Sequence, residues 1–118
     1  MNVDTDRFRK HMRVPMPLVV EVKFEGDQDS QPLLLVDLSW GGMYIRTENP
    51  RDIGLRLTVH LPVAEDNVSL DITGRVVTHD KNINGRVVPG MGIAFDELDH
   101  DAKSLIQKLI NRILQSEA

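Results

Sequence analysis

The fold is decided by residues 55–61, which read Leu-Arg-Leu-Thr-Val-His-Leu. Apolar side chains occupy every second position and polar side chains the positions between them, which is the pattern of a strand with one buried and one wet face. The polar residues 64–67 are typical of a hairpin turn, and apolar positions resume over 68–79. This part of the chain therefore predicts an antiparallel hairpin, in which Gly74 indicates a bulge or a corner.

Four further strands are predicted around this hairpin, at residues 18–24, 32–38, 42–47 and 86–95. Asn84-Gly85 suits a type I′ turn before the last of them. Pro89-Gly90 predicts that this last strand is kinked or begins late. Six strands with short turns and no helical period between them predict an antiparallel barrel or sandwich.

The C-terminal segment changes to a helical period. Apolar side chains recur in steps of three and four, at Ala102, Leu105, Ile106, Leu109, Ile110, Ile113 and Leu114. Asp99 or Asp101 can cap this helix, which is expected to begin at about residue 99. We expect its apolar stripe to cover an open end or seam of the sheet, with a dimer interface as the alternative.

Length and charge restrict the classes of function. The 118 residues suit one domain, and the absence of cysteine excludes disulfide scaffolds and thiol nucleophiles. No apolar run reaches the length of a membrane span and the N-terminal residues are no signal peptide, so a cytoplasmic protein is expected. The net charge of −4 opposes binding to a long polyanion, yet residues 1–13 carry four basic against two acidic side chains. Either a small, local anion site or a solvated basic tail fits this distribution.

Two short motifs stand out on the predicted framework. Arg9-Lys10-His11-Met12-Arg13 places two arginines four residues apart just before the first strand. Asp37-Leu38-Ser39-Trp40-Gly41-Gly42 joins the second strand to the third. Neither motif is specific by itself. Two arginines at this spacing are common by chance, and Asp and Ser in such a turn often bond local amides.

In this order and on these strands, the motifs resemble those of the PilZ domain, the bacterial receptor module for cyclic di-GMP. Two further stretches are similar to signatures of the family: residues 41–45, and residues 90–95 with the acidic residues and the helix that follow them. The resemblance therefore covers about residues 7–115. It implies a mainly β fold, a six-stranded antiparallel β-barrel with a C-terminal α-helix, in a single-domain member. The strand pattern read from the residues agrees with that fold.

The resemblance implies that Arg9, Arg13, Asp37, Ser39 and Gly42 bind cyclic di-GMP. Arginine can form paired hydrogen bonds with phosphate oxygens or with guanine O6 and N7. The carboxylate can accept from guanine N1–H and N2–H₂, and the serine offers a hydroxyl to the ligand or to the turn. The glycine allows a close approach of backbone and ligand where a Cβ would clash.

Four neighbouring residues are candidates for further contacts. Trp40, the only tryptophan of the chain, either stacks on a guanine or caps the hydrophobic end of the barrel. Lys10 either reinforces a phosphate contact or is a solvated flank, and Gly41 belongs to the same glycine pair as Gly42. In similar proteins an arginine at the position of Phe8 helps to hold a second nucleotide, so one ligand per chain is expected here.

The chain is predicted to divide into a flexible arm, residues 1–15, and a barrel with its helix, residues 16–118. The arm carries the arginine motif and has too few large apolar side chains to stay on the barrel unaided. We expect it to fold over the bound nucleotide and to display a ligand-dependent surface to a partner.

These observations favour a non-enzymatic receptor that signals through an unidentified effector protein, in motility, surface attachment or exopolysaccharide control as the resemblance implies. The alternative is an adaptor of the same fold that binds no nucleotide. Catalysis, metals and cofactors are not expected, because the four histidines lie on separate segments and Ser39 has no assigned base. Aromatic residues make up only 4% of the chain, which opposes binding of DNA or RNA. No membrane contact is expected, and the protein is expected to be a monomer or a weak homodimer.

Overall fold

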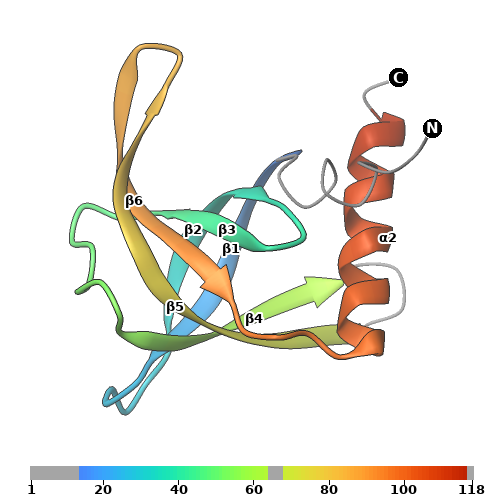
Figure 1. Ribbon diagram of the computed structural model, residues 1–118, viewed down its shortest axis with the longest axis horizontal. Coiled ribbons are helices and arrows are strands. Elements are labelled where there is room, and N and C mark those ends of the chain that lie inside the picture. Colours follow the sequence, from blue (N-terminus) through green and yellow to red (C-terminus); the bar gives the residue numbers. More distant parts are fainter. Residues whose placement is uncertain (1–13, 64–67, 117–118) are drawn as a thin grey trace.

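The computed structural model describes residues 14–63 and 68–116 (Figure 1). The described chain runs through β1 (Val14–Phe24), β2 (Gln31–Leu38), β3 (Gly42–Arg46), β4 (Arg56–Val63), β5 (Val68–Ile83), β6 (Arg86–Phe95) and α2 (His100–Ser116). These six strands pair antiparallel and close into a barrel in the order β1-β2-β3-β6-β5-β4. The prediction of a mainly β, six-stranded antiparallel barrel with a C-terminal helix is confirmed.

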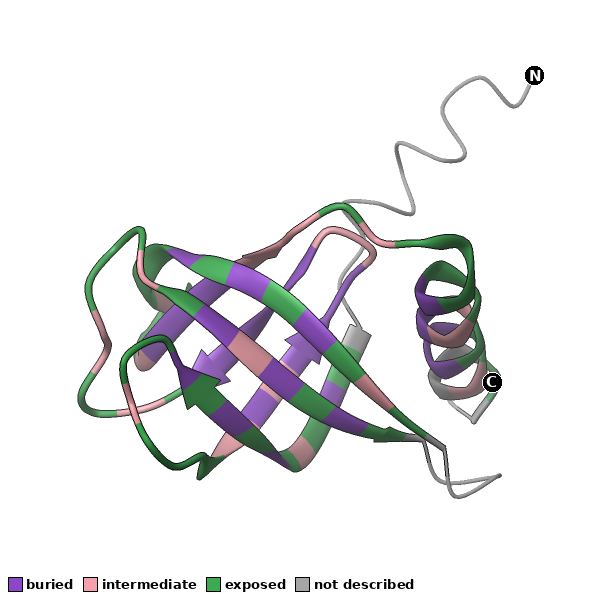
Figure 2. Cartoon of the chain, turned by 90° about the horizontal axis from the view of Figure 1, so that it is seen from below, coloured by how far each residue is buried: buried purple, intermediate pink, exposed green. Residues whose placement is uncertain are grey.

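Alternating side chains fill the barrel, as the strands in Figure 2 show. In β4, Leu57, Val59 and Leu61 are at most 3% exposed, whereas Arg56 and His60 are exposed to solvent. The other strands contribute the same kind of inward residue, including Val20, Val22, Phe24, Leu35, Met43, Ile45, Ile72, Val76, Met91 and Ile93. The period-two pattern of residues 55–61 therefore predicts correctly which face of β4 is buried.

β1 begins at Val14, four residues before the expected start. Pro15 and Pro17 hide this start in the sequence, because proline lacks the N–H that a strand ladder uses. The register between β1 and β2 shifts between Pro15 and Leu18. Residues 14 and 15 of the expected arm therefore belong to the barrel, and the rest of the arm lies outside the described residues.

Gly74 marks a close approach of two strands, and the ladder shows no bulge at this position. The ladder between β4 and β5 runs through Gly74 without a shift, and a Cβ at this position would lie 2.4 Å from the carbonyl oxygen of Ala94. Only glycine lets β5 and β6 come together here. The irregularity lies further along β5, where the register with β6 shifts between Val76 and Thr78.

The β5–β6 hairpin extends beyond the barrel, at the upper left of Figure 1. β5 continues to Ile83, four residues past its expected end, because the polar residues before the turn conceal the strand pattern. At the turn, Asn84 and Gly85 have φ angles of 53° and 84°, as a type I′ turn requires.

β6 begins at Arg86 directly after this turn, so the expectation of a late start is wrong. Pro89 and Gly90 are accommodated by a second register shift, between His79 and Lys81 of the partner strand. Asp80 lies within the shift with a φ of 50°, and its carboxylate accepts a hydrogen bond from the N–H of Gly90 at 3.2 Å.

α2 covers one end of the barrel (Figure 2). Its N-terminus is capped by Asp99, whose Oδ1 accepts from the N–H of Ala102 at 2.8 Å. Ile106, Leu109 and Ile110 are at most 7% exposed and belong to the barrel core. The described part of the stripe is therefore covered within the chain, as expected. No helix within residues 14–63 and 68–116 is long and apolar enough to span a membrane.

Candidate functional site

The second motif forms the turn from β2 to β3. Ser39 closes this turn, because its N–H and its Oγ–H both donate to the carbonyl oxygen of Gly42, at 2.9 Å and 3.2 Å. The residue is buried, at 2% exposure. The sequence predicts that this hydroxyl bonds either the ligand or the turn, and in the structure it bonds the turn.

Gly42 begins β3 and lies against the backbone of β6. A Cβ at this position would lie 2.1 Å from the carbonyl oxygen of Ile93. The close approach that requires glycine here is therefore between two strands of the barrel, and the backbone of β6 is the group that a side chain would strike.

Asp37 lies on the outer face of the barrel, near the end of β2. Its partner across the ladder is Tyr44, and the neighbours of that tyrosine, Met43 and Ile45, point into the core. Side chains alternate along a strand, so Tyr44 and Asp37 share the opposite face. Although it faces outward, the Asp37 side chain is only 11% exposed.

Lys81 covers Asp37 and was not predicted from the sequence. Its Nζ lies 2.6 Å from Oδ2 of Asp37 and 5.5 Å from the ring centroid of Tyr44. The lysine comes from β5, 44 positions further along the chain than the aspartate. Two register shifts between β5 and β6 precede it, so simple alternation does not predict its side. No short-range sequence signal would have found it.

Tyr44 forms the floor under this ion pair. The residue is 2% exposed, and its hydroxyl donates to the carbonyl oxygen of Val88. A Cβ at Gly90 would lie 2.8 Å from the phenol ring, so the glycine leaves room for it. Burial raises the pKa of the Tyr44 phenol, and the carboxylate of Asp80 adds to this shift. The phenol therefore stays protonated and keeps its hydrogen bond.

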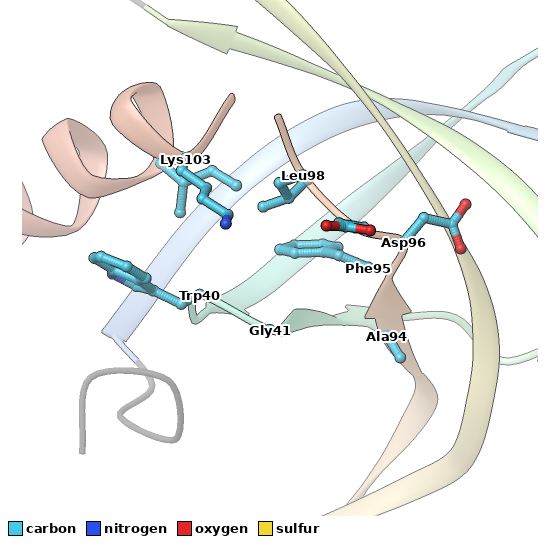
Figure 3. A pocket seen from close by; sticks show the side chains of 9 residues that line it. Trp40, Gly41, Ala94, Phe95, Asp96, Leu98 and Lys103 are labelled. Carbon is cyan, nitrogen blue, oxygen red and sulfur yellow. The ribbon is translucent and has the colours of Figure 1, made fainter. Parts of the chain in front are cut away.

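Trp40 lies on the side of this turn that faces α2. It packs against the barrel core and lines a cavity of about 360 Å³ together with Phe95, Leu98, Lys103 and Ile106 (Figure 3). Its indole Nε1 is buried and has no hydrogen-bond partner among residues 14–63 and 68–116. This is the arrangement expected of a residue that caps the hydrophobic end of the barrel. Gly41 also lines the cavity, so one turn serves both the ion pair and the cavity.

The opposite rim of the cavity is acidic. Asp96 on this rim forms an ion pair with Arg56. The pKa of the Asp96 carboxyl is held below its usual value, mainly by a hydrogen bond from the hydroxyl of Thr73 and to a smaller extent by Arg56. Two of the acids that follow β6 therefore have structural roles, Asp96 in an ion pair and Asp99 as the cap of α2. Within the described part of the chain, no group of three His, Asp or Glu side chains could hold a metal ion.

The site thus has a described half and a half that is not described. The structure brings together Asp37, Ser39 and Gly42, with Trp40 and Gly41 between them. The other four expected contributors, Phe8, Arg9, Lys10 and Arg13, lie outside the described residues. What the described half offers chemically is a carboxylate acceptor beside an ammonium donor, on a rigid floor.

The PilZ domain family model matches residues 7–112 of the chain. Comparison with curated protein sequences finds no match.

Solved structures with this fold include the PilZ domain of YcgR from Escherichia coli with c-di-GMP, at a TM-score of 0.70 and 15% identity over 92% of this chain and 93% of that one. The Bacillus subtilis inhibitor of motility MotI/DgrA has a TM-score of 0.63 and 20% identity, over 92% of this chain and 53% of that one. The Borreliella burgdorferi PlzA protein in complex with c-di-GMP has a TM-score of 0.54 and 23% identity, over 89% of this chain and 36% of that one. The chain thus spans about a third of PlzA. At these identities, the likeness shows the fold.

Proposed function

The chain belongs to the PilZ domain family, matched over residues 7–112, and on this premise we propose that it is a receptor for cyclic di-GMP. The observation that carries the proposal is the state of Asp37. Its carboxylate is nearly buried and is paired with Lys81. Asp37 is also the first residue of the second motif, just before the turn from β2 to β3. An acceptor held in this way loses little conformational entropy when a ligand binds. Two structures of similar fold, those of YcgR and PlzA, are complexes with c-di-GMP.

Each motif residue has a role in this proposal. Asp37 accepts from N1–H and N2–H₂ of one guanine, and Arg9 and Arg13 bind the phosphates or guanine O6 and N7. Ser39 and Gly42 support the ligand by shaping the turn, since the hydroxyl bonds the turn and the glycine admits the neighbouring strand. With Phe8 in place of an arginine, one nucleotide is bound per chain.

The proposed output is a contact with an effector protein. We propose motility, surface attachment or exopolysaccharide synthesis as the process controlled, and the similar fold of an inhibitor of motility supports the first of these. The protein acts in the cytoplasm, has no enzymatic activity or cofactor, and contacts neither nucleic acid nor membrane. It is a monomer or a weak homodimer.

One observation favours a second candidate, an adaptor that binds no nucleotide. The Asp37 carboxylate already has a charged partner in Lys81, so the fold has a use for this aspartate without any ligand. Breaking a largely buried ion pair is costly unless the incoming group replaces its contacts. The adaptor therefore retains Asp37 for stability alone.

Calorimetric titration separates the two candidates. Cyclic di-GMP should give a saturable heat with one nucleotide per chain, while GTP and cyclic di-AMP should give none at the same concentrations. The absence of heat from cyclic di-GMP at roughly tens of micromolar would favour the adaptor. Equal heat from all three nucleotides would show an unspecific anion site.

A further inference from the structure

The ion pair between Asp37 and Lys81 is asymmetric in its exposure. The aspartate side chain is 11% exposed and the lysine side chain 33% exposed, and Nζ lies 2.6 Å from Oδ2. An ammonium group has three donors. Because the bond to Asp37 uses one of them, Lys81 keeps two further donors beside the carboxylate, and its side chain is the more exposed of the pair.

The lysine is held in this place by its surroundings. Its ammonium lies 5.5 Å from the ring centroid of Tyr44, within the range of a cation–π contact. The hydroxyl of Tyr44 is anchored on Val88 of β6. The backbone just before Lys81 is fixed by Asp80, which has a φ of 50° and accepts from the N–H of Gly90. The pair is therefore a preorganised acceptor and donor.

This order of groups matches one edge of guanine. The Watson–Crick edge carries two neighbouring donors, N2–H₂ and N1–H, and then one acceptor, O6. A carboxylate offers only acceptors and an ammonium only donors. Since O6 is the exocyclic oxygen on C6, the ring atom next to N1, a group that reads O6 must lie directly beside the group that reads N1–H, as Lys81 lies beside Asp37.

We propose that Lys81 is a further ligand-binding residue, which donates to O6 of the guanine whose N1–H and N2–H₂ are bound by Asp37. This inference rests on the proposed cyclic di-GMP receptor function. It also gives the site a basis for rejecting adenine. Adenine carries a donor, N6–H₂, where guanine carries O6, and an acceptor at N1. Against this pair, donor would face donor and acceptor would face acceptor.

The test compares Lys81→Met with Lys108→Met in calorimetric titrations with cyclic di-GMP. Lys108 is exposed on α2, so its variant removes the same charge away from the site. Lys81→Met should weaken binding at least about tenfold, because a charge-assisted hydrogen bond is lost. Lys108→Met should bind as the wild type does.

A second ligand separates reading of O6 from support of Asp37. In the 6-thio analogue of cyclic di-GMP, O6 is replaced by sulfur, which is a weak acceptor. The wild type should bind this analogue more weakly than cyclic di-GMP, and Lys81→Met should bind both equally. Lys81→Arg, which keeps a cationic donor, should retain part of the discrimination and also serves if Lys81→Met does not fold.

Each outcome decides between the two proposals. If the wild type does not bind cyclic di-GMP, the receptor function is wrong and the role of Lys81 fails with it. If the wild type binds and Lys81→Met binds equally well, only the role of Lys81 is wrong. If affinity falls but the preference over the 6-thio analogue is unchanged, Lys81 merely positions Asp37, and the contact with O6 is overturned.

Discussion

Gly42 and Ile93 are in backbone contact across β3 and β6, and a Cβ on the glycine would lie 2.1 Å from the carbonyl oxygen of Ile93. Real Cβ atoms do not come so close to a carbonyl oxygen, so any side chain here forces the two strands apart. A glycine that belongs to the ligand motif is therefore required by the barrel itself. Loss of nucleotide binding in a variant of Gly42 would not by itself show that the glycine contacts the ligand.

Replacing Gly42 by alanine should destabilise the protein by about 1–3 kcal/mol or more, because the added methyl group overpacks a closed ladder. Gly74→Ala should lose stability for the same reason, since a Cβ there would lie 2.4 Å from the carbonyl oxygen of Ala94. Urea denaturation measures the free energy of unfolding of both variants, and a Gly42→Ala variant as stable as the wild type would contradict the strand contact.

Trp40 should tolerate phenylalanine better than its size suggests. Its buried indole N–H has no partner within the part of the chain that the structure describes, and an unsatisfied buried donor costs about 1–3 kcal/mol. Trp40→Phe removes this cost together with some packing, so the free energy of unfolding should change by less than about 1 kcal/mol. Trp40→Ala should lose about 2–4 kcal/mol, because the contact with the core is lost. Denaturation followed by circular dichroism tests this, and equal losses in both variants would contradict it.

The ion pair of Asp27 with Arg51 predicts a pH dependence of stability. The hydrogen bond from Arg51 lowers the pKa of Asp27 below its ordinary value of 3.8. A carboxyl whose pKa is lower in the folded state stabilises the fold above the unfolded value and loses this contribution as the pH falls through the folded value. Asp27→Asn should therefore lower the melting temperature at pH 7 and have a smaller effect below about pH 3.8. A difference in melting temperature that does not depend on pH would rule out this pair as the cause.

Arg9→Ala and Arg13→Ala should each weaken binding of cyclic di-GMP at least about tenfold, through the loss of a charge-assisted contact. The melting temperature without ligand should barely change, because both residues precede β1. Arg86→Ala, which removes an exposed arginine next to the hairpin turn, is the matched control and should bind normally. A variant of Arg9 or Arg13 that is destabilised, yet binds normally once folded, would make that arginine structural.

A strand was predictable wherever one of its faces lies in the barrel core and the other in solvent, since apolar and polar residues then alternate along the sequence. β4 is the clearest case. Local chemistry similarly allowed prediction of the Asn84-Gly85 turn and of Asp99 as the helix cap, because each depends on neighbouring residues alone. Prolines concealed the start of β1, and the extension of β5 beyond the barrel carries no buried face to reveal it.

The candidate site was only partly predictable, for a different reason. Asp37 is recognisable because it belongs to a contiguous motif. Lys81 reaches it from a distant strand whose register shifts twice before that point, and no short-range pattern reports such a meeting. The partner of Gly42 is similarly a backbone group of β6, which only the closed barrel brings into contact.

The central claim, that Asp37 reads guanine, is tested most directly by calorimetric titration of Asp37→Ala with cyclic di-GMP beside the wild type and Asp71→Ala. Asp71 pairs with His60 on the surface at 2.7 Å, so its variant also removes a paired carboxylate, away from the motif. The wild type and Asp71→Ala should bind one nucleotide per chain with equal affinity, and Asp37→Ala should bind at least about tenfold more weakly. Equal affinity of Asp37→Ala and the wild type would contradict the claim.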